Sequence, residues 1–369
     1  MDLREIVSTA PREAFLRGYA EQPLKEGQVR VKVDFAAAKH GTEFAAFRGI
    51  DPHIENRFDD GYKLFMPKDG QRVAPKDGRL VAPKDGQQVA PKDGQQVAPF
   101  FMRPGNMYVG KVSELGEGVD GVKVGDRVAG YGPVRPSQTT YAGDVLAVPE
   151  HMSWKEAVCY DPAQFALGGV RDGQVRLGDK AAVFGLGAIG LMTAQMLKLA
   201  GASLVIVCDP IAKRRDVALA NGADIAIDPA NEDAGMRIKQ LTGGRGADVI
   251  IEASGFYDAL QAAIRGIAYS CNIAVVGWYH ECHGGLDFGR EAHFNRPNLI
   301  FSRACSEPDL KYPNWSFGRI CSTCWDMLSR GMLKCENVVD PVVPFVESAD
   351  AYMAIERDAS NSVKLGVAF

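Results

Sequence analysis

The run Ala181–Asp209, AAVFGLGAIGLMTAQMLKLAGASLVIVCD, decides the fold of this chain. A buried strand (Ala181–Phe184) leads through a glycine-rich turn into a helix over residues 188–200, and a second strand (Leu204–Cys208) follows. The turn is a G-x-G-x-x-G in the strand–turn–helix setting of a dinucleotide-binding loop. In such a loop the first glycine allows the tight turn, the second lets the backbone approach a pyrophosphate, and the third lets the helix pack against the strand. We therefore predict that the helix N-terminus binds phosphates, with cofactor contacts from Gly185, Gly187, Ala188, Ile189 and Gly190.

Asp209 ends the second strand, about 20 residues after the glycines, where this fingerprint requires an acidic residue. Its carboxylate would accept hydrogen bonds from the adenine ribose and repel a 2′-phosphate, so the predicted cofactor is NAD. Three basic residues shortly after it, Lys213, Arg214 and Arg215, leave NADP open. The alternative is that the glycines serve only strand–helix packing in another doubly wound fold.

The pattern of short buried strands alternating with helix-length segments continues beyond Asp209, which is typical of a parallel sheet. We predict an α/β Rossmann domain, with a doubly wound parallel sheet, over residues 153–303. The further strands are expected at Ala223–Ile227, Asp248–Glu252 and Ile273–Val276, and the further helices at 212–221, 232–241 and 258–268.

The flanking regions read differently. Residues 28–35 alternate polar and apolar side chains, and Tyr108–Val148 holds short β-runs broken by Gly and Pro, so residues 1–152 are predicted to form a mostly β domain. Residues 304–369 contain one expected helix (315–330) and a final amphipathic stretch, Ser348–Arg357. Between the two β regions an eight-residue unit occurs four times over residues 67–98, which we interpret as a surface loop without chemistry; the alternative is a lysine-bearing lid beside the active site.

Composition excludes several classes of partner. The chain has 369 residues, 46% of them hydrophobic, and a net charge of −4, so it offers no basic field for nucleic acid. No apolar stretch approaches the ~20 residues that cross a bilayer, and the start does not read as a signal peptide. The eight cysteines are therefore expected to be reduced, and the cytoplasm is the expected location.

Four further motifs occur in a fixed order along the chain: Gly125–Val128 (GDRV), Gly178-Asp179, Gly246–Glu252 (GADVIIE), and the ending with Pro344-Phe345, Ala349–Tyr352 and Lys364. With them the chain resembles the medium-chain dehydrogenase/reductase superfamily, with its zinc-type alcohol, polyol and threonine dehydrogenases. The resemblance implies a GroES-like catalytic domain (1–152), the Rossmann domain (153–303) and a return to the catalytic domain (304–369). It also implies a homodimer or homotetramer in which the strand 298–302 pairs across the interface.

By the same resemblance a catalytic zinc would be held by a Cys in a C-G-[ST]-D segment, a His in a G-H-E segment, and a Glu or Cys further on. The corresponding positions here are His40, Asn106 and Asp161, and the family's lobe of four closely spaced cysteines is absent. Zinc needs three or four N, S or O donors, and His40 and Asp161 supply two. We therefore predict an enzyme without catalytic zinc, in which His40 and Asp161 are the ligands to test if metal binds.

Without zinc, a side chain must take the proton of the substrate hydroxyl. We predict His40 as this base, Asp161 as the group that orients its ring, and Thr42 as the relay toward the nicotinamide ribose that the resemblance implies. Lys39 is the rival base, since burial lowers the pKa of a lysine. The alternatives are that His40 only replaces a lost ligand in a loop, that Thr42 is a turn or cap residue, and that Asp161 begins a turn.

Other polar residues are weaker candidates. The run His280-Glu281-Cys282-His283 suggests metal superficially, but a substrate contact from one of His280, His283 and His293 is the better interpretation, and His53 is another possible contact. Cys321 and Cys324 fall in a predicted helix and are interpreted as buried thiols.

The leading prediction is an NAD-dependent dehydrogenase acting on a secondary hydroxyl of a sugar, polyol or other small molecule. One alternative retains the cofactor through transient oxidation, as an epimerase or lyase. Another is a protein that binds NAD without catalysis, and a zinc-free quinone or enone reductase is a further one.

Overall fold

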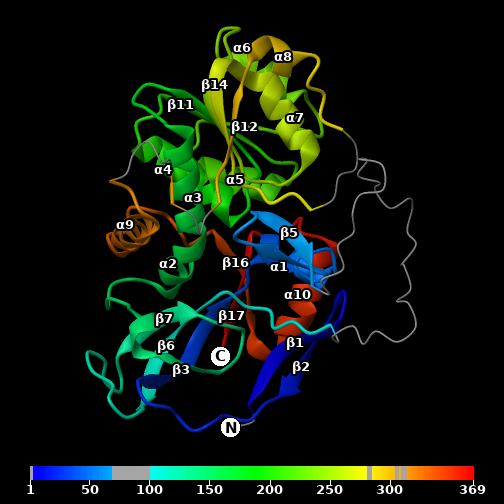
Figure 1. Cartoon of the computed structure of the whole chain (residues 1–369). Helices are drawn as coiled ribbons and strands as arrows, with labels where there is room; N and C mark the ends of the chain where they lie inside the picture. Colours follow the sequence, from blue (N-terminus) through cyan, green and yellow to red (C-terminus); the bar gives the residue numbers. More distant parts are fainter. Residues whose placement is uncertain (1–2, 69–99, 281–284, 304–306, 309–313) are drawn as a thin grey trace, which may run out of the picture.

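Two β-sheets, one above the other in Figure 1, organise the chain. The computed structural model describes residues 3–68, 100–280, 285–303, 307–308 and 314–369. From residue 69 onward the repeat lies outside this part of the chain, so its interpretation as a surface loop stays a prediction. None of the helices among the described residues is long and apolar enough to span a membrane.

The upper sheet is the predicted parallel sheet. Its six strands follow the order β12-β11-β10-β13-β14-β15, and every neighbouring pair is parallel. This is the order 3-2-1-4-5-6 of a dinucleotide-binding domain. Successive strands are added toward one edge up to β12 and then toward the other edge from β13, so the topological switch point lies between β10 and β13. The strands are β10 (Lys180–Phe184), β11 (Leu204–Cys208), β12 (Ile225–Ile227), β13 (Ala247–Glu252), β14 (Ile267–Val275) and β15 (Asn298–Phe301).

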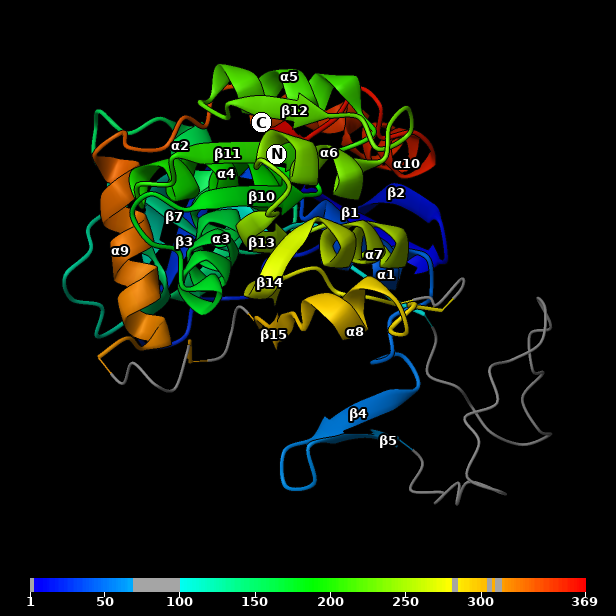
Figure 2. The ribbon, with the colours of Figure 1, turned by 90° about the horizontal axis from the view of Figure 1, so that it is seen from above.

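Helices cover both faces of this sheet (Figure 2). Successive side chains of a strand point to opposite faces, so a sheet covered on both sides needs apolar residues at every position. In β10, Ala181 and Val183 belong to the core shared with α3 and α4, whereas Ala182 and Phe184 belong to the core shared with α6 and α7. The helices that pack on this sheet are α3 (Tyr160–Gly173), α4 (Ala188–Leu199), α5 (Ala212–Ala220), α6 (Ala234–Leu241), α7 (Tyr257–Gly266) and α8 (Glu291–Asn295). The short helix α2 (Trp154–Val158) precedes them and packs on α3, α9 and the lower sheet.

The lower sheet is formed from both ends of the chain. Its order is β16-β17-β3-β6-β7-β9, and β8 also pairs with β3. The last strand, β17, lies antiparallel to β3, and this pairing brings the C-terminal residues beside the segment that leads into α1. The strands are β3 (Gln28–Ala37), β6 (Met107–Leu115), β7 (Arg127–Tyr131), β8 (Ser137–Tyr141), β9 (Leu146–Ala147), β16 (Val339–Pro344) and β17 (Lys364–Ala368).

Two hairpins and three helices complete the described fold. The hairpin of β4 and β5 stands off from the rest of the chain in Figure 2, and its exposed apolar side chains include Tyr62 and Leu64. The elements are the hairpin strands β1 (Arg4–Ala10), β2 (Glu13–Gly18), β4 (Asn56–Asp59) and β5 (Leu64–Pro67), the helices α1 (His40–Phe47), α9 (Phe317–Ser329) and α10 (Ser348–Arg357), and the 3₁₀ turns Ala142–Asp144 and Phe345–Glu347.

The fold class and every strand predicted for the Rossmann domain are confirmed. The helix predicted over 258–268 ends at Gly266, because β14 begins at Ile267. The helix α3 was not predicted, since its three glycines have low helix propensity. A Cβ on one of them, Gly169, would lie 2.6 Å from Cγ2 of Val276, so α3 can pack this closely on the sheet only with a glycine there. The same packing stabilises the helix despite its low propensity.

Candidate active site

The glycine loop between β10 and α4 has the geometry of a phosphate cradle. Gly185 adopts φ of +84°, and a Cβ there would lie 2.6 Å from the backbone nitrogen of Ser254. A Cβ on Gly190 would lie 1.8 Å from the carbonyl oxygen of Gly185. Gly187 caps α4, and no atom lies within 4 Å of the Cβ it lacks. Two glycines are therefore needed by the fold itself, and Gly187 leaves open space in front of the first turn, Ala188 and Ile189.

Asp209 lies directly after β11 and is almost fully buried. Its Oδ2 accepts a hydrogen bond of 2.7 Å from the Leu186 N–H, and its Oδ1 accepts one of 2.8 Å from the Ile211 N–H. The carboxylate therefore joins the glycine loop to the segment before α5. This places a negative charge next to the loop, where the fingerprint predicts a ribose contact.

The three basic residues after Asp209 already have partners. Arg214 donates a hydrogen bond of 3.0 Å to a carbonyl oxygen, and Arg215 forms an ion pair of 3.0 Å. A 2′-phosphate would compete with these contacts as well as with the charge of Asp209. The partners are Asp340 and the Asn361 carbonyl for Lys213, the Ser362 carbonyl and the Asp209 carboxylate (3.9 Å) for Arg214, and Asp228 and the Asp209 carbonyl for Arg215.

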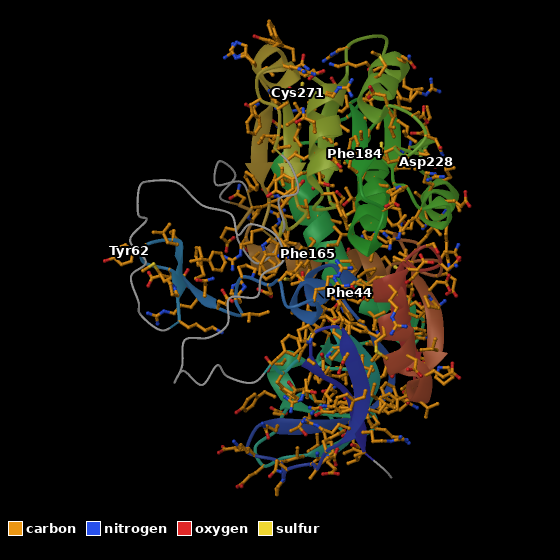
Figure 3. The ribbon with its side chains drawn as sticks, turned by 90° about the vertical axis from the view of Figure 1, so that its right-hand side faces the viewer. Phe44, Tyr62, Phe165, Phe184, Asp228 and Cys271 are labelled. Atoms are coloured by element: carbon orange, nitrogen blue, oxygen red, sulfur yellow. The ribbon has the colours of Figure 1, made fainter. Side chains whose placement is uncertain are left out.

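An ion pair joins the two segments that the resemblance assigns to catalysis. Lys39 directly precedes α1, and Asp161 lies in the first turn of α3. Nζ of Lys39 lies 3.1 Å from Oδ1 and 3.0 Å from Oδ2 of Asp161, and 4.0 Å from the ring centroid of Phe165. Asp161 is buried and Lys39 is partly exposed, so Nζ is the accessible member of the pair. Figure 3 shows Phe165 in the middle of the molecule, between the two sheets.

The predicted pairing of His40 with Asp161 is therefore wrong, because the carboxylate binds Lys39. His40 is also the first residue of α1 and not part of a loop. Its ring stacks on Phe44 at 5.0 Å, and its Nε2 accepts a hydrogen bond of 3.3 Å from the Leu365 N–H. Burial, followed by the charge of nearby cations, lowers the pKa of His40 to about 3. A ring that is neutral and already bonded does not favour the predicted role of His40 as base.

The first turn of α1 also holds Thr42, which does not cap the helix because the N-cap position is Lys39. Its predicted role as relay stays a prediction. The next residue, Glu43, accepts hydrogen bonds of 3.3 Å from the Gly105 N–H and from the Tyr352 hydroxyl, and burial raises its pKa to about 7.

A second lysine, Lys364, lies beside this site and was not predicted as a site residue. Lys364 begins β17 and is 3% exposed. Its Nζ donates a hydrogen bond of 2.7 Å to the Ala38 carbonyl and lies 3.5 Å from Oδ1 of Asn106. Burial lowers the pKa of Lys364. A lysine at the head of the apolar run Leu365–Ala368 was a signal that a cation is buried there.

The donors at the three family positions do not fit a zinc ion. Nε2 of His40 accepts from a backbone N–H, Asp161 is neutralised by Lys39, and Asn106 is an amide beside the ammonium of Lys364. Among the residues that the structure describes, no three His, Cys, Asp or Glu side chains come close enough to hold a metal ion. Zinc needs three or four converging N, S or O donors, and ammonium groups repel it.

The weaker histidine and cysteine candidates lie in different parts of the structure. The rings of His53 and His280 both lie close to Trp278 at the end of β14, with centroid distances of 5.8 and 4.2 Å. Glu281, Cys282 and His283 lie outside the described residues. Cys324 is fully buried on α9, and burial raises its pKa to about 12, which confirms the interpretation of this residue as a buried helix thiol. Cys321 lies on the same helix but is only partly buried.

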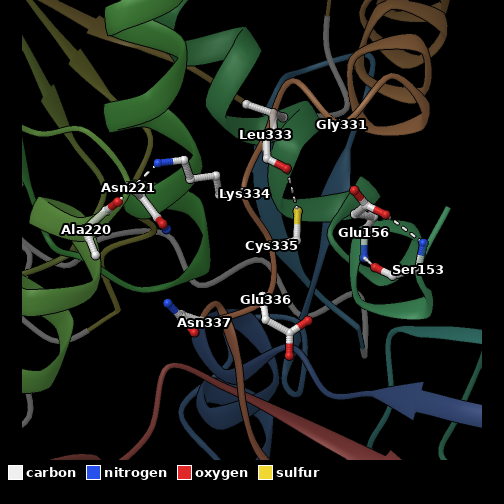
Figure 4. A pocket seen from close by; sticks show the side chains of 10 residues that line it. All are labelled: Ser153, Glu156, Ala220, Asn221, Gly331, Leu333, Lys334, Cys335, Glu336 and Asn337. Atoms are coloured by element: carbon white, nitrogen blue, oxygen red, sulfur yellow. Dashed lines mark hydrogen bonds between the residues drawn. The ribbon is translucent and has the colours of Figure 1, made fainter. Parts of the chain in front are cut away.

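A cavity of about 440 Å³ lies away from these residues (Figure 4). It is lined by the start of α2, the end of α5 and the segment 331–337. None of its lining residues is a predicted cofactor or catalytic residue. Its wall includes Ser153 and Glu156, whose reciprocal hydrogen bonds form a capping box at the start of α2.

The glycine loop and the order of the parallel sheet define a dinucleotide-binding domain joined to a second, mostly β domain. The model of the family described as "Zinc-binding dehydrogenase" matches residues 188–311. D-guloside 3-dehydrogenase of Escherichia coli (strain K12) is 45% identical over 373 aligned positions, covering 100% of both chains. (R,R)-butanediol dehydrogenase of Bacillus subtilis (strain 168) is 31% identical, covering 52% of this chain and 61% of that protein. The chain therefore belongs to the zinc-binding dehydrogenase family, within the medium-chain dehydrogenases.

Solved structures show the same fold. An alcohol dehydrogenase from Escherichia coli CFT073 in complex with NADH is 21% identical, with a TM-score of 0.71 and coverage of 100% of this chain and 99% of that chain. A zinc-binding dehydrogenase from Sinorhizobium meliloti 1021 bound to NADP is 16% identical, with a TM-score of 0.72 and the same coverage. Related dehydrogenases thus bind either dinucleotide.

Proposed function

We propose that this chain is an NAD(H)-dependent dehydrogenase that oxidises a secondary hydroxyl of a pyranoside, or reduces the corresponding ketone, without a catalytic zinc. The observation that carries the proposal is the Lys39–Asp161 ion pair, which occupies a family metal-ligand position. The substrate class is supported by the full-length relative, whose name states oxidation of a guloside at its third carbon. NAD is proposed over NADP because the carboxylate of Asp209 lies beside the glycine loop, and because Arg214 and Arg215 already bond groups of the protein, Asp209 among them.

Oxidation of an alcohol requires that its hydroxyl proton leaves as the hydride departs. A nicotinamide held at the glycine loop would supply the hydride acceptor. Nζ of Lys39, in its neutral form, accepts the proton, and the carboxylate of Asp161 stabilises the ammonium that forms. The buried ammonium of Lys364 adds positive potential on the side of Asn106, which favours the partial negative charge on the substrate oxygen.

A kinetic comparison of two Lys39 variants tests this chemistry. Net NADH formation from methyl D-guloside and other glycosides distinguishes a dehydrogenase from an epimerase, a lyase or a non-catalytic binder. Lys39→Met and Lys39→Arg should both lower kcat by about 10²–10⁴-fold, because arginine keeps the charge but does not accept a proton. The NAD dissociation constant should not change. An active Lys39→Arg enzyme would contradict the role of Lys39 as base.

We also propose that the chain forms a homodimer through β15. This strand is the edge of the parallel sheet, and Phe301 at its end is 74% exposed. An unpaired apolar edge favours pairing with a second copy. Sedimentation of the parent chain and of Leu299→Pro tests this, because the Leu299 N–H points away from β14, to which the Ser302 N–H bonds. The variant should be monomeric, and an unchanged mass would contradict the proposal.

A further inference from the structure

An aromatic cluster links the two halves of the chain at the end of β14. The indole of Trp278 follows that strand, and the ring of His53 follows α1, with 5.8 Å between their centroids. His280 lies 4.2 Å from Trp278 on one side, and Phe65 of the β5 hairpin lies 5.0 Å from His53 on the other. Ligands of doubly wound sheets bind beyond the carboxyl ends of the strands, which is where Trp278 lies.

The cluster is accessible as well as ordered. Trp278 is 39% exposed and the side chain of His53 is 51% exposed. One oxygen of Asp51 accepts hydrogen bonds from both the backbone N–H of His53, at 2.7 Å, and its ring Nδ1, at 2.9 Å. A carboxylate only accepts, so Nδ1 is the donor, and the ring edge that carries Nε2 is left to meet a ligand. The imidazole is therefore held in one orientation before any ligand arrives, which lowers the entropy cost of binding.

This combination matches the chemistry of a sugar ring. A pyranose has a face of C–H groups, which suits the electron-rich face of an indole, and a rim of hydroxyls, which suits a fixed imidazole nitrogen. A simple alcohol would use neither group. Asp51 is already bonded to His53, and Phe65 packs against the His53 ring. A sugar ring would therefore meet the exposed parts of Trp278 and His53.

We propose that Trp278 and His53 form the sugar-binding subsite of this enzyme, with the pyranose ring stacked on Trp278 and one of its hydroxyls bonded to Nε2 of His53. This inference rests on the proposed function, since it assigns residues that recognise the pyranoside. It makes Trp278 and His53 specificity-determining residues and leaves proton transfer to the Lys39–Asp161 pair.

The test compares Trp278→Ala with Trp278→Phe, which keeps a stacking ring, and with Tyr141→Ala, which removes an exposed aromatic residue elsewhere. Trp278→Ala removes the apolar contact between the indole and the bound sugar. It should therefore raise KM for methyl D-guloside about tenfold to a hundredfold, with a smaller change in kcat. Trp278→Phe should recover most of the affinity, and Tyr141→Ala should match the parent chain. His53→Ala should raise KM about tenfold, the effect of one lost hydrogen bond. An unchanged KM in Trp278→Ala would overturn the inference while the proposed function stands.

Calorimetric binding separates the two proposals. The ligand is methyl 3-deoxy-D-guloside, which lacks the reacting hydroxyl, and the protein is loaded with NAD. Binding that depends on Trp278, in a chain that forms no NADH from any glycoside, would support the subsite and refute the proposed reaction. Absence of binding to the parent chain would overturn the subsite.

Discussion

Two glycines of the loop, three positions apart, are expected to fail in opposite ways when changed to alanine. A Cβ on Gly190 would lie 1.8 Å from the carbonyl oxygen of Gly185 and 2.9 Å from its carbon. The obstacle is backbone, so no side-chain rotation relieves it. We expect Gly190→Ala to cost about 3 kcal/mol, at the upper end for overpacking, and to lower Tm by roughly 6–12 °C before any cofactor is added.

Gly187→Ala is the matched control, because nothing lies within 4 Å of its added Cβ and its φ of −66° suits alanine. Loss of a glycine N-cap destabilises the helix, whereas the lower conformational entropy of the unfolded chain stabilises the folded state. The two effects oppose each other, so Tm should change by only about 2 °C. The added methyl group would, however, occupy the space that the pyrophosphate needs. The NAD dissociation constant should therefore rise about tenfold or more, equivalent to ~1.4 kcal/mol.

Thermal melts without ligand and NAD titration by calorimetry measure both effects in the same samples. The reasoning is refuted if Gly187→Ala binds NAD as tightly as the parent chain, because the open space would then not be the phosphate site. It is also refuted if Gly190→Ala melts at the parental temperature.

Two further changes probe the cofactor preference and a buried carboxyl group. Asp209→Asn should lower the affinity ratio of NAD to NADP about tenfold, because it removes the charge that repels a 2′-phosphate; an unchanged ratio would show that Asp209 does not set the preference. Burial raises the pKa of Glu252, at the end of β13. Between its ordinary pKa of about 4.3 and the raised value, the folded chain retains a proton that the unfolded chain has lost, so stability falls as pH rises through this window. Glu252→Gln does not titrate and should flatten this slope in urea unfolding, whereas an equally steep slope would assign it to other groups.

The cofactor loop was predictable because its signal is local. Strand, turn and helix lie within the 29 residues Ala181–Asp209, and each glycine has a distinct steric reason that a single chain reveals. The short helix α2 had a local signal too, since Ser153 and Glu156 have capping-box spacing.

The catalytic pair was not predictable in the same way. Lys39 and Asp161 are separated by 122 positions, and their contact depends on how α3 packs on the sheet beside the segment before α1. The resemblance to the superfamily identified both segments, and His40 was predicted as the partner of the carboxylate. Pairing of β17 with β3 decides otherwise, because it brings the Leu365 N–H to Nε2 of His40 and buries Lys364 beneath the site.

In the proposed mechanism lysine side chains, and not a metal, serve this active site. The most direct measurement is the zinc content of purified chain by elemental analysis, with NADH formation measured on the same sample before and after a strong chelator. We predict far less than one zinc per chain and an unchanged rate after chelation. About one zinc per chain, with activity lost to the chelator and restored by zinc, would contradict the account.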